Sequence, residues 1–160
     1  MTDQHREEPA LLPGFLPDRR QRELIDTIRD LVRRDGDRWT AHRQLVVTAL
    51  LANGHHPTMD EVLELVRRHD PHVSSATVYR TLTVLVQIGA VRRIAIDGRP
   101  ARYEIAIGRR AHHHLVQIDG TGVEEFEDRA LDAAITRLLL ERGLELAGRG
   151  VELFVRRTAG

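Results

Sequence analysis

The first half of the chain carries apolar residues at the spacing of amphipathic helices. The first such pattern begins at Arg19 and stops at Gly36. Its apolar positions are Leu24, Ile28, Leu31 and Val32. Residues three and four positions apart share one face of a helix, so this pattern predicts a helix with one buried side. Residues 1–17 hold three of the six prolines and show little periodicity, so we expect a loose leader there.

Three further helices are predicted, each with a start or stop signal. The second runs from about residue 40 to residue 53 and stops before Gly54. The third starts at Thr58, which forms a capping box with Glu61. The fourth follows the Ser74-Ser75 pair and ends before Gly89. The apolar stripes expected to be buried are Met59, Val62, Leu63 and Val66 in the third helix and Val78, Leu82, Leu85 and Val86 in the fourth.

The periodicity then changes from helix to strand. The segments VRRIAI and ARYEIAI flank Asp97-Gly98, which is a hairpin signal between β-branched residues. Short helices followed by a basic two-stranded wing are the layout of a winged helix-turn-helix. In that fold the last helix before the wing enters the major groove of DNA.

The second half predicts a small mixed unit. Strands are expected at 114–118 and 123–126, followed by a helix over 128–142 and a return to strand over 144–155 with a break at 148–150. Leu131, Ile135 and Leu138 are expected to point inward from the helix. About 50 residues are too few to bury a large core, so a second copy is expected to pair with this unit.

The predicted fold class is therefore α+β. A winged helix-turn-helix occupies residues 18–107, and a small αβ dimerisation domain occupies residues 108–160. The composition, with 41% hydrophobic and 30% charged residues, is that of a folded soluble protein. No apolar run approaches the roughly 20 residues needed to span a bilayer, and no secretory signal is evident, so we expect a cytoplasmic protein without membrane contact. The absence of cysteine excludes disulfides, thiolate zinc sites and iron–sulfur clusters.

The net charge of the whole chain is zero, but the charge of individual segments is informative. The 24 basic residues, all arginine, balance 24 acidic ones, but residues 71–103 hold five arginines against one acid, Asp97. Such a local excess fits contact with phosphates. In the fourth helix the inward stripe leaves five side chains facing outward: Thr77, Tyr79, Arg80, Thr83 and Gln87. Arginine pairs with guanine, and tyrosine or threonine can contact a thymine methyl group or a phosphate, so we favour DNA binding over an ordinary solvated face.

The nine histidines are placed unevenly. Three of them are consecutive, His112, His113 and His114, at the entry to a predicted strand. Alternation puts His112 and His114 on one face and His113 on the other. Further ligands could come from His56, Glu104 and Glu125. Nitrogen and oxygen donors without sulfur suit Fe(II), Mn(II) or Zn(II). The alternative is a run of solvated histidines, as expected for His5, His42, His69 and His72.

The segment Ser74–Leu82 closely resembles the recognition helix of ferric uptake regulator (Fur) family repressors. The resemblance extends over roughly residues 36–155 and includes Arg102-Tyr103-Glu104 and His112-His113-His114-Leu115. It implies a winged-helix domain, a dimerisation domain, and a regulator that binds divalent metal and then DNA. The implied metal ligands are His56, Glu104, His112, His114 and Glu125. The implied DNA-contacting residues are Arg38, which matches a position that reaches the minor groove, and Ser75, Thr77, Tyr79 and Arg80.

The resemblance thus predicts a homodimeric repressor that is not an enzyme and that binds double-stranded operator DNA. It implies one divalent metal per subunit, Fe(II) or Mn(II) in the cell and Zn(II) as purified, which fixes the angle between the domains. Many members of the family carry a structural zinc held by cysteine thiolates. That site cannot form here, because Gln117 and Gly120 stand at the positions of its first two cysteines and the chain has no cysteine. A further site of the family corresponds here to Ala111, His113, Asp132 and Arg149. Two of these four residues cannot be ligands, so we interpret that site as degenerate.

Two other functions stay open. A peroxide sensor would use Fe(II) at the same ligands to oxidise a nearby histidine. The other alternative is of a different functional class, a metalloenzyme whose metal is held by His112, His114 and a carboxylate. It is disfavoured, because catalysis requires an open coordination position and the expected ligands could saturate the ion.

Overall fold

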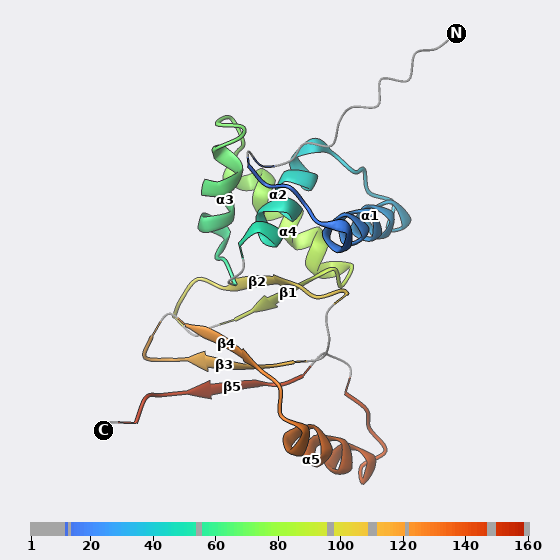
Figure 1. Cartoon of the computed structure of the whole chain (residues 1–160), viewed down its shortest axis with the longest axis vertical. Helices are drawn as coiled ribbons and strands as arrows, with labels where there is room; N and C mark the ends of the chain where they lie inside the picture. Colours follow the sequence, from blue (N-terminus) through green and yellow to red (C-terminus); the bar gives the residue numbers. More distant parts are fainter. Residues whose placement is uncertain are drawn as a thin grey trace. The chain divides into compact units, whose positions relative to one another are not determined.

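The computed structural model describes Leu12 and residues 14–53, 56–95, 98–108, 112–120, 122–146 and 150–158. The chain forms two compact units (Figure 1). The first comprises Met1–Ala95 and Pro100–Ile107, and the second comprises Ile96–Arg99 and Gly108–Gly160. Within the described residues, every helix is too short or too polar to cross a membrane.

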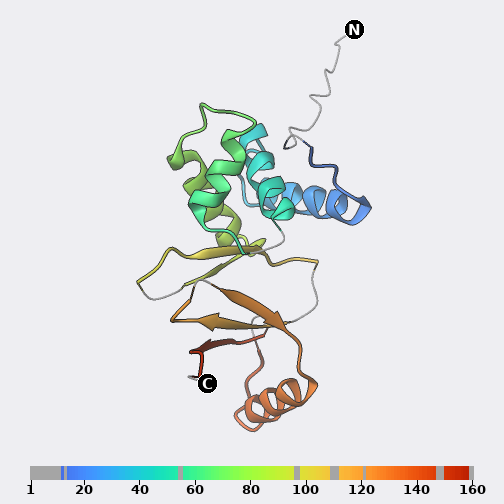
Figure 2. The same cartoon turned by 60° about the vertical axis from the view of Figure 1, so that its left-hand side comes forward.

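The first unit contains the predicted helices. Their bounds are α1 Arg19–Arg34, α2 Ala41–Ala52, α3 Met59–Arg67 and α4 Ser75–Gln87. Each begins after a side chain that accepts a hydrogen bond from the first turn, and these N-caps are Asp18, Thr40, Thr58 and Ser74. The predicted capping box is confirmed, because the Glu61 carboxylate accepts from the Thr58 N–H at 2.7 Å. Figures 1 and 2 both place these helices on one side of a two-stranded hairpin.

The core of the first unit centres on α2, which buries every residue from Gln44 to Leu50. The predicted stripes of α3 and α4 are confirmed at Val62, Leu63 and Val66 and at Val78, Leu82 and Leu85. In α1 the buried residues are Ile25, Ile28 and Val32. Ile25 was not predicted, and Leu24 is only half-buried. The buried face of α1 is therefore rotated by about one residue relative to the predicted stripe.

The hairpin consists of β1 Val91–Ile94 and β2 Arg102–Ile105, which pair antiparallel as the predicted wing does. The register pairs Arg92 with Glu104. The segment before α3 lies along β2, since the Tyr103 N–H donates to the Pro57 carbonyl at 2.9 Å and Thr58 bridges Arg102. This pairing sets the chain around residue 56 beside the chain around residue 104. Asp97, in the predicted turn, lies outside the described residues.

The second unit contains a three-stranded sheet in the order β4-β3-β5. Its elements are β3 His113–Gln117, β4 Val123–Phe126, α5 Arg129–Leu140 and β5 Glu152–Val155. Strand β3 pairs antiparallel with β4 and parallel with β5. Helix α5 supplies the crossover that the parallel pair requires, and Asp128 caps it.

Two expectations for this unit are wrong. The predicted strand over 144–155 is confined to Glu152–Val155, and 147–149 lie outside the described residues. Leu138, expected to point inward, is 49% exposed, and α5 has no buried residue. Leu131 and Ile135 are half-buried. The physical reason is that α5 packs little against the sheet, which it contacts through Asp132 and His113, so most of its apolar side chains are not covered.

Candidate functional site

Helix α4 presents a polar and aromatic face. Ser75 and Arg80 are exposed, and Tyr79 is 59% exposed despite its size. Thr77 is half-buried and takes part in the helix cap, where its N–H and hydroxyl both contact the Ser74 Oγ. An exposed guanidinium and an exposed phenol on one helix can contact base edges and phosphates.

Arg38 lies exposed in the loop before α2, and this loop is held by Arg43. The Arg43 guanidinium donates to the Arg38 carbonyl and pairs with the Asp37 carboxylate at 3.2 Å. This role of Arg43 was not predicted from the sequence. In the sequence, Arg43 is marked only by its place one turn inside a capped helix, five residues after Arg38. That spacing does not predict the contact of its side chain with the loop.

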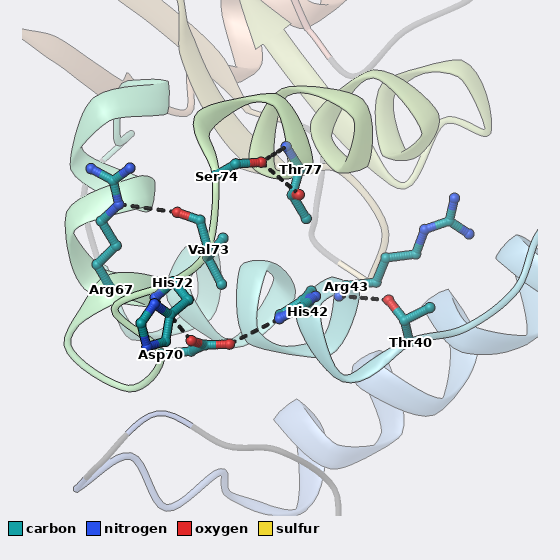
Figure 3. A network of polar contacts seen from close by, with 9 residues as sticks. All are labelled: Thr40, His42, Arg43, Arg67, Asp70, His72, Val73, Ser74 and Thr77. Carbon is teal, nitrogen blue, oxygen red and sulfur yellow. Dashed lines mark hydrogen bonds and ion pairs between the residues drawn. The ribbon is translucent and has the colours of Figure 1, made fainter.

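A polar network fastens the turn before α4 to the start of α2 (Figure 3). The Asp70 carboxylate contacts the His42 Nε2 at 3.0 Å and accepts from the His72 N–H at 3.0 Å. The hydrogen bond with His42, followed by that from His72, holds the pKa of Asp70 below its ordinary value. Arg67 donates to the Val73 carbonyl across the same turn. The position of α4 against α2 thus rests on polar contacts as well as on the core.

Part of the basic excess of the wing is neutralised within the protein. Arg92 pairs with Glu104 at 3.4 Å, and Arg102 pairs with Glu61 at 3.6 Å. Arg93 points to the exposed face of the same strand. The excess expected to contact phosphates is therefore smaller than the sequence count, and Arg80 and Arg93 are its exposed members.

The first unit brings together two of the predicted metal ligands. The His56 Nε2 lies 3.3 Å from the Glu104 Oε2, and both side chains are buried. The pairing of the Pro57 region with β2 produces this contact, since His56 directly precedes that pairing and Glu104 lies within β2. An imidazole and a carboxylate that are in contact and shielded from water are both donors that a divalent cation accepts.

The second unit brings together the other three predicted ligands. The rings of His112 and His114 lie edge to face, with centroids 4.8 Å apart. The His112 Nε2 is 4.0 Å from the Glu125 Oε1, and the sheet register places His114 opposite Glu125. The predicted alternation is confirmed, because His113 points away from this cluster.

His113 occupies the other face and uses both ring nitrogens within the second unit. Its Nε2 lies 3.1 Å from the Asp132 Oδ1 of α5, and its Nδ1 accepts from the Val151 N–H at 3.1 Å. The ring is buried. Of the site interpreted as degenerate, the structure thus places His113 and Asp132 in contact, whereas Ala111 and Arg149 lie outside the described residues. This pair links β3 to α5.

The donor chemistry of the two clusters fits a divalent ion of intermediate hardness. Each cluster offers imidazole nitrogen and carboxylate oxygen and no sulfur, and these are donor types that Fe(II), Mn(II) and Zn(II) accept. Both clusters are mostly buried, so a bound ion would gain from reduced competition by water.

Comparison with known proteins points to one family. Residues 34–154 match the ferric uptake regulator family. A ferric uptake regulation protein of Brucella abortus is 32% identical over 127 residues, which cover 79% of this chain and 89% of that protein. A peroxide-responsive repressor of Staphylococcus saprophyticus is 31% identical over 96 residues, or 60% of this chain and 63% of that protein. The solved ferric uptake regulator from Pseudomonas aeruginosa with manganese matches with a TM-score of 0.70 at 31% identity, covering 81% of this chain and 97% of that one.

Proposed function

The chain belongs to the ferric uptake regulator family, and on that premise we propose that it is a repressor that binds operator DNA when Fe(II) or Mn(II) is bound. It is a metal-responsive transcriptional regulator and not an enzyme. The observation that carries the proposal is the pair of nitrogen and oxygen clusters, one in each unit, on the residues that the family resemblance assigns to the metal.

We propose that the two clusters hold one divalent ion per subunit. His56 and Glu104 come from the first unit, and His112, His114 and Glu125 come from the second. An ion shared by both units would fix the angle between them. Energetic coupling of this kind between two sites is typically about 1–3 kcal/mol.

The angle matters because the protein is proposed to act as a homodimer on double-stranded DNA. Two recognition helices related by a two-fold axis must enter major grooves separated by whole helical turns, each roughly 34 Å. Metal would select the arrangement with that spacing from those that the metal-free protein samples. The exposed apolar side chains of the second unit support pairing with a second copy.

DNA contact is proposed for α4 and for the loop before α2. Tyr79 and Arg80 would contact bases or phosphates from the major groove, Ser75 and Thr77 lie at the start of the same helix, and Arg38 would reach the minor groove. We expect Arg80→Ala to cost about 1–3 kcal/mol of operator binding and to relax specificity. Arg38→Ala should weaken binding and lower its salt dependence, with a smaller loss of specificity.

The test is a titration of DNA binding, by fluorescence anisotropy on genomic fragments, with Fe(II), Mn(II) and Zn(II) in turn. Wild-type protein should bind operator fragments only with metal. His114→Ala should remove this metal response, whereas His69→Ala, which replaces an exposed histidine of the first unit, should retain it. DNA binding that does not depend on metal, or equal behaviour of the two variants, would contradict the proposal.

The similarity to a peroxide-responsive repressor favours peroxide sensing as a second candidate function. The same DNA-binding experiment can be extended to test it. Peroxide is added to the Fe(II)-loaded complex, and the protein is then digested and analysed by mass spectrometry. A metal sensor should stay on DNA with its histidines unchanged. Release from DNA with a mass increase of one oxygen on a histidine of the clusters would assign peroxide sensing.

A further inference from the structure

One of the proposed metal ligands already contacts a cation supplied by the chain. The Arg92 Nε lies 3.4 Å from the Glu104 Oε1. The other carboxylate oxygen, Oε2, faces the His56 Nε2 at 3.3 Å. Glu104 is therefore shared between a ligand partner on one side and a permanent positive charge on the other.

The sheet register makes this contact a fixed feature of the wing. Arg92 on β1 and Glu104 on β2 are directly paired residues of the antiparallel ladder. Directly paired side chains have Cβ atoms about 4.5–5.5 Å apart, so the two charged groups stay within reach of each other as long as the hairpin holds. The Arg92 side chain is 19% exposed and that of Glu104 is 4% exposed. Water therefore screens the interaction only weakly.

We propose that Arg92 sets the metal affinity of the regulator by competing with the ion for Glu104. This inference rests on the function proposed above. Arg92 would act as a resident counter-ion that satisfies the buried carboxylate in the metal-free protein. It would thereby raise the free metal concentration at which the site fills.

The direction of the effect follows from the charges in the two states. Without metal, a buried carboxylate that loses its cation is destabilised, because desolvation of the charge is no longer compensated. With metal, the ion compensates that carboxylate, and Arg92 adds repulsion between a guanidinium and a divalent cation. Arg92 therefore stabilises the metal-free state and opposes the metal-bound state, and both terms weaken metal binding.

The effect acts on charge, not on ligand preference. Fe(II), Mn(II) and Zn(II) carry the same charge, so Arg92 shifts the affinity for all of them by a similar factor. It would keep their order, which donor type and geometry set. The residue thus adjusts the concentration threshold of the response and leaves its selectivity to the ligands.

The neighbouring arginine provides a matched control. Arg93 follows Arg92 on β1 but lies on the exposed face, opposite Tyr103 in the register. Both substitutions remove one guanidinium from the same strand and change the net charge equally. Only Arg92 contacts a proposed ligand.

The experiment measures the Kd for Co(II) alone, by direct optical titration and by competition with a chromophoric chelator at pH 8, on the full-length protein without DNA. We expect Arg92→Gln to bind Co(II) at least tenfold more tightly than wild type, about 1.4 kcal/mol. Arg93→Gln should remain within twofold of wild type. Arg92→Lys, which keeps the charge, should also stay within about threefold. The same order of variants should hold for Mn(II).

Three results would overturn the proposal. Arg92→Gln could bind Co(II) no more tightly than wild type, or Arg93→Gln could tighten binding as much, which would indicate a general surface-charge effect. If Arg92→Gln does not fold, Arg92→Met keeps the aliphatic stem without the charge and is measured in its place. Failure of both to fold would make Arg92 a structural residue only. A wild-type protein that binds no Co(II) or Mn(II) would instead refute the proposed function, so the two failures are distinguishable.

Discussion

The two units bury apolar side chains to very different extents. In the described part of the chain, every buried apolar residue lies between Leu12 and Ile105 except Val116. In the second unit the buried side chains are mainly histidines, while large apolar residues are exposed. Those exposed residues are Ile118, Leu138, Leu140, Leu144, Leu146, Leu153 and Phe154.

This difference indicates two sources of stability. The first unit resembles an ordinary small domain, in which burial at about 25 cal/mol per Å² of apolar surface offsets the loss of chain entropy. The second unit lacks such a core, and its apolar surface remains available for a partner. A unit of this kind depends on association, and on the pairing of its strands, more than on its own interior.

The largest effect is expected at the exposed apolar face of the second unit. Phe154→Glu should weaken dimerisation at least about a thousandfold, or about 4 kcal/mol, because two-fold symmetry brings both new charges into one interface. Sedimentation velocity at micromolar concentration measures this. Leu16→Glu, at an 89% exposed position of the first unit, is the control and should leave the dimer intact. Persistence of the Phe154→Glu dimer would show that another surface mediates association.

The next effect concerns the core of the first unit. Leu82→Ala removes a side chain that is 1% exposed and should lower the free energy of unfolding by about 2–5 kcal/mol. Trp39, the single tryptophan, lies in this unit and reports its urea unfolding by fluorescence. Leu16→Ala should change the midpoint little. Equal losses from both substitutions would contradict a core confined to the buried positions.

A smaller effect is expected for the contact between β3 and α5. His113→Ala leaves Asp132 and the Val151 N–H without their partner and should destabilise the second unit by about 1–3 kcal/mol. Faster amide hydrogen exchange in β3 and β5 would report this loss. Metal affinity should stay within threefold, in contrast to His114→Ala. A large loss of metal binding in His113→Ala would mean that this ring ligates the ion.

The smallest effect belongs to the exposed network before α4. The pKa of Asp70 is lowered in the folded protein, chiefly by His42, so its contribution to stability is present above about pH 4 and is lost as pH falls below that value. Asp70→Asn should lower the urea midpoint of Trp39 fluorescence slightly at pH 7. The difference from wild type should shrink below pH 4. A difference that grows toward low pH would reverse the assigned sign.

A chelation experiment sharpens the comparison further. The chain has no cysteine, so the thiolate zinc that many relatives are expected to carry cannot hold its second unit together. The dimer should therefore survive strong chelator, while its melting temperature falls because a ligand of the native state is removed. Sedimentation with and without chelator tests both statements. A monomer after chelation would make the metal a structural element and would refute the proposal that it only fixes the angle between the two units.

Local signals in the sequence determined much of the fold and of the candidate site. The capping box at Thr58, the stripes of α3 and α4, and the hairpin were predicted because caps and periodicity act within a few residues. The opposite orientations of His113 and His114 follow from strand alternation alone. The grouping of the proposed ligands required more than local reasoning, and it came from the family resemblance.

Tertiary structure decided the contacts between residues far apart in the chain. The pairing of Arg92 with Glu104 depends on the hairpin register, and that of His42 with Asp70 spans 28 residues. The sequence count of basic charge could not reveal which arginines are neutralised by such contacts. Leu138 was expected to be buried because apolar residues recur around it at helical spacing. That spacing does not say how closely the sheet packs against the helix. Periodicity is encoded locally, whereas register and coverage depend on the whole assembly of elements.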